Sequence, residues 1–200
     1  MGSALGWVAH SGVVQGIIIG AVLAFLTAIL VLNSVTRTIT TTVNGWSAIP
    51  GCGQPGNGVL VRAACAKALP VVNVFSEAAY WTATADGSGR RLVGGSDYVL
   101  RFRPGQLPPN DAFWSLTVTD AIGYMVSNSI NRSSFDDRSD LAKNADGSID
   151  IYLQQTVPTG HEQNWLPIPS RRFKLMLRAY LPGAAVLDGS YHLPPVVRAH

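Results

Sequence analysis

The chain has 200 residues and a mass of 21.3 kDa, and 47% of its residues are apolar while only 14% are charged. This size fits one domain with a short appendage, and the apolar content excludes disorder over most of the chain. The net charge of +3 comes from basic residues scattered singly or in pairs, which is not the electrostatic footprint of a nucleic-acid-binding protein. We therefore expect no nucleic acid partner.

The N-terminal segment, residues 1–36, contains no Asp, Glu, Lys or Arg. Within it, residues 13–32 read VVQGIIIGAVLAFLTAILVL, which as a helix would be about 30 Å long, close to the thickness of a bilayer's hydrocarbon core. A secretory signal peptide would have a basic residue before a shorter apolar core and a small-residue cleavage site, and this segment has neither. A buried globular helix of this length would rarely lack every charge. The segment predicts an uncleaved transmembrane helix whose partner is the lipid bilayer.

Small residues recur every four positions along this predicted helix, at Gly12, Gly16, Gly20, Ala24 and Ala28. Such a stripe allows a second helix to approach closely, although Gly and Ala are also common in membrane helices in general. We expect a packing face for another membrane protein or for a second copy of this chain. The single nearby basic residue, Arg37, gives only weak support for a cytosolic C-terminal domain.

The two cysteines, Cys52 and Cys65, stand thirteen positions apart in a segment rich in Gly and Pro. A disulfide that closed this loop would add about 3 kcal/mol of stability in the chain-entropy model and would indicate an oxidising compartment. The alternative is a pair of reduced, unrelated thiols. We expect the disulfide, and with it a periplasmic or extracellular domain.

Residues 37–76 predict a membrane-proximal connector in which 59–68 form a short amphipathic helix that ends before Pro70. Beyond the connector, short alternating runs bounded by turn residues predict strands at 79–85, 98–102, 113–120, 123–126, 149–154 and 173–181. Because strands and helices do not alternate, we expect an all-β domain at 77–200, a jelly-roll-like antiparallel sandwich, preceded by one transmembrane α-helix.

No metal site, cofactor or catalytic residue is expected. The four histidines are not spaced as metal ligands, and the sequence contains no nucleophile elbow, phosphate-binding loop or dinucleotide motif. Polar and aromatic residues near strand ends are candidate ligand-binding residues: Arg178, Tyr180, Tyr152, Trp165, Asn131, Arg132 and Asp120. They could form a pocket with an arginine for an anionic group. The alternative is that Arg178 pairs with a carboxylate such as Asp120 and the aromatic rings fill the core.

Ordered blocks between Glu77 and Arg198 resemble a bacterial family. They are LPPNDAFWSLTVTDAIGYMVSN, INRSS, KNADGSIDIYLQQTVP, NWLPIPSRRFKLMLRAYLP and VLDGSYHLPPVVR. The chain resembles the domain-of-unknown-function 1214 (DUF1214) family, whose members often accompany a second domain, number 1254. The resemblance implies a jelly-roll-like sandwich, includes short members with one N-terminal membrane helix, and brings no established reaction. It draws attention to residues in the matching blocks, namely Trp114, Asn131, Arg132, Asp146, Tyr152, Asn164, Trp165, Arg178 and Tyr180.

Three functions follow as hypotheses. The first is a membrane-anchored, non-catalytic accessory or scaffold subunit of a membrane protein complex. The second is a periplasmic binding domain for a small anionic or carbohydrate ligand, and the third is a hydrolase or isomerase that uses Asp120, Tyr124 or His161. The expected location is the bacterial inner membrane, with a single membrane pass and the C-terminal domain in the periplasm.

Overall fold

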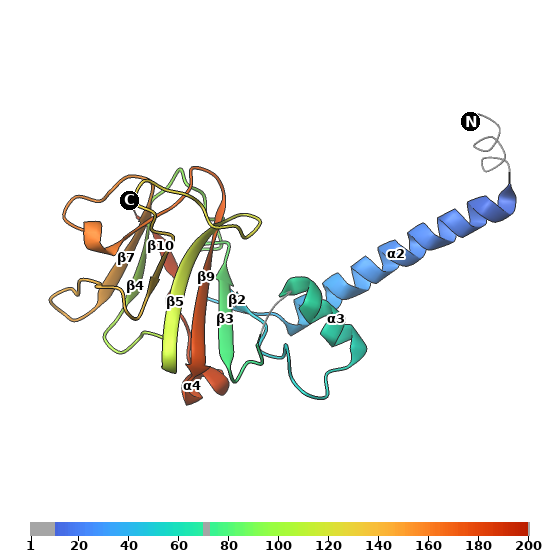
Figure 1. Ribbon diagram of the computed structural model, residues 1–200, viewed down its shortest axis with the longest axis horizontal. Helices are drawn as coiled ribbons and strands as arrows, with labels where there is room; N and C mark the ends of the chain where they lie inside the picture. Colours follow the sequence, from blue (N-terminus) through green and yellow to red (C-terminus); the bar gives the residue numbers. More distant parts are fainter. Residues whose placement is uncertain (1–10, 70–72, 200) are drawn as a thin grey trace. The chain divides into compact units, whose positions relative to one another are not determined.

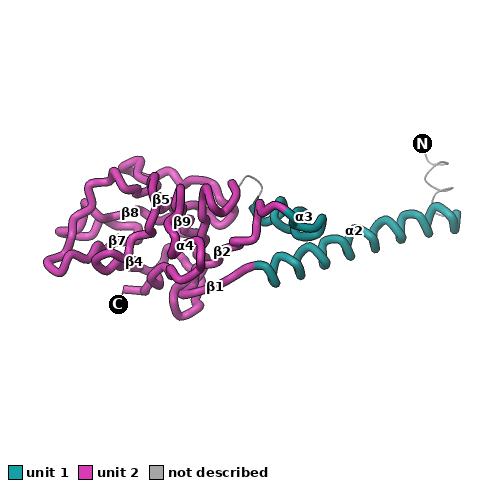
Figure 2. The backbone as a smooth tube through the Cα atoms, turned by 90° about the horizontal axis from the view of Figure 1, so that it is seen from below, with its two compact units in different colours: residues 1–39, 56–70 teal, residues 40–55, 71–200 magenta. Residues whose placement is uncertain are grey.

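The computed structural model describes residues 11–69 and 73–199 (Figure 1). The chain divides into two compact units, one within residues 1–39 and 56–70 and the other within residues 40–55 and 71–200 (Figure 2). We describe each unit by itself.

The first unit contains helix α2, Gly12–Ile39, and helix α3, Val59–Ala68. No residue of α2 is buried, and the helix is long and apolar enough to cross a membrane. It continues seven residues beyond the apolar run that ends at Leu32. Hydroxyls in this last part bond back to the preceding turn: Thr36 Oγ1 donates to the carbonyl of Leu32 at 2.8 Å, and Thr38 Oγ1 to that of Ser34 at 3.1 Å. Because their polar groups are satisfied along the helix, these residues extend it rather than end it.

Helix α3 has the bounds that the sequence predicts, and it contacts α2 within this unit. Its buried residues are Ala64 and Cys65, and the ammonium group of Lys67 donates a hydrogen bond to the side-chain oxygen of Asn33. The helix ends at Ala68, where the amide of Leu69 donates to the carbonyl of Cys65 at 2.8 Å.

The second unit is mostly β. A six-stranded antiparallel sheet has the order β1 (Thr41–Val43), β2 (Trp46–Ala48), β3 (Ala78–Ala83), β9 (Phe173–Pro182), β5 (Asn110–Asp120) and β6 (Ser134–Asp136). A four-stranded sheet has the order β10 (Val196–Arg198), β4 (Tyr98–Phe102), β7 (Ile149–Gln154) and β8 (Trp165–Pro167), and only its β7–β8 pair is parallel. Two short helices, η1 (Glu162–Asn164) and α4 (Ala184–Leu187), complete the unit.

Buried side chains from both sheets form one hydrophobic cluster. The alternation that the sequence shows along β9 is seen in the burial of its residues, since Phe173, Leu175, Leu177 and Ala179 are buried and the residues between them are half-buried. On β4 and β7, Leu100 and Ile151 are fully buried partners in the same cluster. The prediction of a β-rich domain with an N-terminal apolar helix is confirmed.

The expected boundary of the β domain at residue 77 is wrong, because part of the predicted connector belongs to the sheet. The pair Asn44-Gly45, with φ of 54° and 84°, makes the tight turn that joins β1 to β2. Trp46 then anchors this hairpin, since its side chain is 2% exposed and its Nε1 donates to the carbonyl of Pro194 at 2.9 Å. The Asn-Gly pair is a local signal for the turn, whereas the bond that holds the hairpin in the unit joins residues 148 positions apart and has no local signal.

Two other local expectations are also corrected. The alternation along β9 predicts that Leu181 is buried. This residue instead has φ of 49° and is 50% exposed, and the next residue, Pro182, is buried in its place. The expected strand at 123–126 is reduced to one bridge, Thr119 with Met125. The Asp120 carboxylate accepts the amides of the three residues that follow Ala121 and so folds this segment into a turn.

Candidate functional site

The second unit contains a cavity of about 270 Å³ at one side of the six-stranded sheet. Its lining comes from three segments: the β1–β2 hairpin with Pro50, Phe75 with Trp81 of β3, and the end of α4 with the loop that follows it. The lining residues are Thr41, Val43, Trp46, Ala48, Pro50, Phe75, Trp81, Val186, Leu187, Asp188, Gly189, Tyr191, His192 and Leu193. The volume is near the lower end of the range for small-molecule pockets.

Aromatic rings form much of the cavity wall. Trp81 and Tyr191 meet edge to face, with ring centroids 6.1 Å apart and an interplanar angle of 69°, and so make a corner of two ring planes. Trp46 and Phe75 extend this aromatic lining. Both tryptophans belong to the buried core, and Phe75 and Tyr191 pack against it while half-buried, so the walls are held by the fold.

The polar atoms of this wall are largely engaged with the backbone. The Tyr191 hydroxyl donates to the carbonyl of Gln106 at 2.9 Å, and burial raises the pKa of Tyr191, so the hydroxyl stays protonated. The Trp46 indole donates to Pro194, as described above. The cavity therefore offers a ligand mainly ring faces and apolar side chains.

One residue of the described lining, Asp188, has a carboxylate side chain. Asp188 is exposed and accepts the amide of Ser190 at 2.8 Å, and hydrogen bonds from Ser190 hold the pKa of Asp188 below its usual range. His192 is also at the exposed edge. No lysine or arginine is among the lining residues that the structure describes, although the chain carries 15 basic residues.

The ligand-binding candidates from the sequence lie outside this cavity, and the structure divides them among separate places in the β unit. Arg178 and Tyr180 lie on β9 and point away from the core; Arg178 Nη1 donates to Thr117 Oγ1 at 3.2 Å, and Tyr180 stacks on Phe113 at 4.3 Å between centroids. In the described part of the chain Arg178 makes no ion pair with Asp120, whose carboxylate instead closes the turn after β5.

Two other candidates, Tyr152 and Trp165, lie on β7 and β8 of the four-stranded sheet, whereas Asn131 and Arg132 lie in the loop between β5 and β6 of the six-stranded one. Tyr152 stacks on His161 at 4.5 Å, and the Trp165 indole donates to the carbonyl of Gln154 at 2.9 Å. Arg132 Nη1 donates to the carbonyls of Glu162 and Trp165, each at 2.9 Å, and so ties its loop to η1 and β8. These bonds give Arg132 a structural role. Asn131 lies in the same loop with φ of 50°, beside a smaller hollow.

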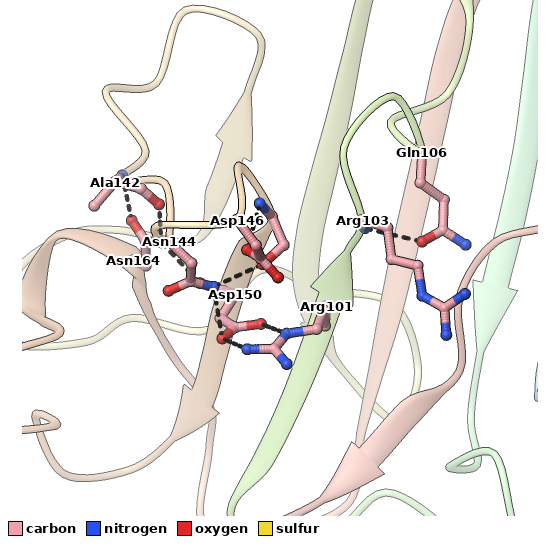
Figure 3. A network of polar contacts seen from close by, with 9 residues as sticks. Arg101, Arg103, Gln106, Ala142, Asn144, Asp146, Asp150 and Asn164 are labelled. Carbon is pink, nitrogen blue, oxygen red and sulfur yellow. Dashed lines mark hydrogen bonds and ion pairs between the residues drawn. The ribbon is translucent and has the colours of Figure 1, made fainter.

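Two of the residues that the resemblance singled out, Asp146 and Asn164, belong to a polar network around β7 (Figure 3). Arg101 on β4 binds Asp150 on β7 through two parallel bonds of 2.6 and 2.7 Å, and this lowers the pKa of Asp150. Asn144 adds a bond to the same carboxylate at 3.0 Å, and Asn164 donates to the backbone carbonyl of Asp150 at 2.8 Å. This network closes a loop, and every member is bonded within the protein.

The groups proposed for catalysis are also separated in the fold. Asp120 and Tyr124 lie at the turn after β5 of the six-stranded sheet, whereas His161 stacks against β7 of the four-stranded one. Among residues 11–69 and 73–199, no three His, Cys, Asp or Glu side chains gather as they would around a metal ion.

The predicted packing residues of α2 and the two cysteines are the remaining sites from the sequence. A Cβ added at Gly12, Gly16 or Gly20 would meet no described heavy atom within 4 Å outside the helix itself, so this face of α2 is open. Cys52 and Cys65 are both disulfide-bonded.

Sequence reasoning missed the cavity because most of its residues lie either in the predicted connector, at 41–50 and Phe75, or beyond the last predicted strand, at 186–193. Two signals could have found part of the site. The motif Asn-Gly-Trp at 44–46 combines a hairpin turn with a large aromatic residue, and Asp188-Gly189 marks a turn directly before Tyr191.

The comparisons with known proteins bear on the same β unit. A family model described as "Protein of unknown function (DUF1214)" matches residues 77–184, more than half of the chain. No curated protein matches. Among solved structures, the VPA0106 protein from Vibrio parahaemolyticus is similar, with 28% identity and a TM-score of 0.62, over 72% of this chain and 36% of that one.

An uncharacterised protein from Burkholderia cenocepacia matches with 15% identity and a TM-score of 0.43, over 88% of this chain and 49% of that one. The present chain thus spans about a third of the length of the Vibrio protein and about half of the Burkholderia protein. On the match to residues 77–184, the chain belongs to the DUF1214 family.

Proposed function

We propose that this protein is a membrane-anchored binding domain that takes a small organic ligand in the aromatic cavity of its β unit. The observation that supports this proposal most is the cavity itself, which has a volume of about 270 Å³ and is lined by Trp46, Phe75, Trp81 and Tyr191 among others. Concave sites with apolar walls and a few polar groups are the usual form of small-molecule sites. In this proposal helix α2 is the membrane anchor. The two sheets, which share one core, support a jelly-roll-like sandwich as the domain that contains the cavity.

The ligand class differs from the anionic one that the sequence suggested. An anion needs a positive partner or several free donors, and the described lining has no lysine or arginine and has its Trp46 and Tyr191 donors engaged. A neutral or positively charged ligand suits this lining. The disulfide-bonded cysteines support a periplasmic position for the β unit, where the ligand would be met.

Filling the cavity is expected to abolish binding of a small aromatic probe. Ala48 lines the cavity and is half-buried, so Ala48→Phe places a ring in the space that a ligand would occupy. We expect p-cresol to show saturation transfer from the full-length protein in maltoside micelles, and this signal to fall to the level of empty micelles in Ala48→Phe. Ligand-observed NMR measures it.

The control for this experiment is Ala121→Phe, which adds the same ring at an exposed position outside the cavity. It should retain the wild-type signal. Thr41→Trp, at the exposed edge of the cavity, repeats the block without touching the core in case Ala48→Phe does not fold. Equal signals from wild type and from a folded, blocked variant would reject the cavity as the binding site.

A second candidate function is an accessory subunit of a membrane complex. Two observations favour it: the chain spans only 36% of its Vibrio relative, and the small-residue face of α2 is open. We expect a partner to co-purify in mild detergent in fixed stoichiometry and to be lost in the double variant Gly16→Leu, Gly20→Leu. Ala21→Leu makes the same kind of change on another face of the helix and should keep the partner. Mass analysis that finds only the lone chain in wild type would reject this candidate.

A further inference from the structure

The charge and the rings of the cavity together define a narrower ligand class. From this juxtaposition we propose that the cavity recognises an organic cation of the alkylammonium type, with the ring faces of Trp81 and Tyr191 against its methyl or methylene groups and the Asp188 carboxylate as counter-charge. The inference rests on the proposed binding function and specifies its ligand.

The aromatic corner is the first part of the argument. An alkylammonium group is large, weakly hydrated and positive, and it is attracted to the negative faces of aromatic rings, most strongly to tryptophan. Trp81 and Tyr191 meet edge to face at 69°, and both rings line the cavity together with Trp46 and Phe75. A compact cation can therefore touch more than one ring at once.

The charges at the edge are the second part. Asp188 is the one carboxylate among the described lining residues, and its hydrogen bonds with Ser190 keep it ionised at neutral pH. No Lys or Arg in that lining can pair with this carboxylate, which shares the exposed edge of the cavity with His192. The one formal charge among Asp, Glu, Lys and Arg of that lining is therefore negative, whereas the net charge of the chain is +3.

The occupied donors are the third part. A sugar or another polyhydroxylated ligand needs several hydrogen-bond partners in its site, and two of the donors in the lining, the Trp46 indole and the Tyr191 hydroxyl, already donate to backbone carbonyls. An alkylammonium group without N–H donors needs none of these bonds. The cavity therefore fits a quaternary or highly substituted ammonium group better than a sugar.

Choline and its uncharged carbon isostere, 3,3-dimethylbutan-1-ol, form the matched pair of probes. We expect the full-length protein in maltoside micelles to bind choline at least about tenfold more tightly than the isostere, as expected for ring contacts joined to a counter-charge. Isothermal titration calorimetry at about pH 8, where imidazole groups in general are uncharged, measures both affinities.

Asp188→Asn tests the counter-charge. The asparagine oxygen can still accept the Ser190 amide, so the loop is preserved while the charge is removed. We expect choline affinity to fall about tenfold and isostere affinity to stay unchanged. Asp146→Asn is the control, because Asp146 is an exposed carboxylate that accepts the amide of Ser148 in the same way, at 3.0 Å, outside the cavity.

The results separate the two proposals. Choline that binds no better than its isostere, or that is unaffected by Asp188→Asn, would overturn the cation inference, while the p-cresol experiment independently decides whether the cavity binds ligands at all. An alkylammonium group could come from a free molecule or from a lipid headgroup. Glycerophosphocholine that binds as tightly as choline would indicate the headgroup, and choline binding alone would indicate the free compound.

Discussion

Replacing Gly94 with alanine is expected to destabilise the β unit by about 3 kcal/mol or more, or to prevent its folding. Gly94 is buried, and a Cβ at this position would lie 1.9 Å from the carbonyl oxygen of Pro169 and 2.7 Å from Cα of Ser170. Both obstacles are backbone atoms, so no side chain can rotate away. The amide of Gly94 also donates to the carbonyl of Arg171 at 3.0 Å, which keeps the two segments together.

The neighbouring glycine provides the matched control. Gly95 is exposed, and a Cβ there would meet nothing within 4 Å. Gly95→Ala should change the free energy of unfolding by no more than about 0.5 kcal/mol. Chemical denaturation of both full-length variants in the same detergent compares them, and similar losses in the two would show that the close approach at Gly94 does not exist.

Removing the Asn164 side chain is expected to cost about 3 kcal/mol. Asn164 is 5% exposed, and its amide makes three bonds of 2.8 Å: its oxygen accepts the amide of Ala142, and its nitrogen donates to the carbonyls of Ala142 and Asp150 (Figure 3). Asn164→Ala leaves these backbone groups without a partner, and the carbonyl of Asp150 lies where the bond is buried. The loop around Ala142 then loses its connection to β7.

The adjacent Gln163 tests whether burial is the reason. Gln163 is exposed and makes one side-chain bond, from its nitrogen to the carbonyl of Asp140 at 2.6 Å. Gln163→Ala should therefore cost about 1 kcal/mol or less. Thermal unfolding, followed by far-ultraviolet circular dichroism, measures both variants, and a Gln163 effect equal to that of Asn164 would contradict this explanation.

The parts of the fold that the sequence predicts well are those with a regular period. The apolar run of α2 and the alternation on β9 depend only on neighbouring residues, so the pattern reports burial directly. The prediction failed where a distant contact decides the local structure. The β1–β2 hairpin is held by Trp46 binding to Pro194, almost 150 residues away, and no local signal records that bond.

The candidate site was harder to predict than the fold for a related reason. Arg178 is a candidate because its guanidinium can bind an anion, and Arg132 because it is polar and near a strand end, but Arg132 binds backbone carbonyls and Arg178 binds a threonine hydroxyl. Residue type alone does not distinguish a ligand-binding arginine from one that is engaged in structure. The cavity combines Trp81 from a core strand with Tyr191 from a loop after the last long strand, and only the folded chain brings them together.

The strands at the borders of the two sheets are all short. β1 and β6 border the larger sheet and β10 and β8 the smaller one, and each has three residues. Long open borders invite sheet-to-sheet joining and aggregation when copies of a domain collide. Borders of three residues offer few backbone groups for such joining. Copies of the β unit that meet can therefore part again without exchanging strands.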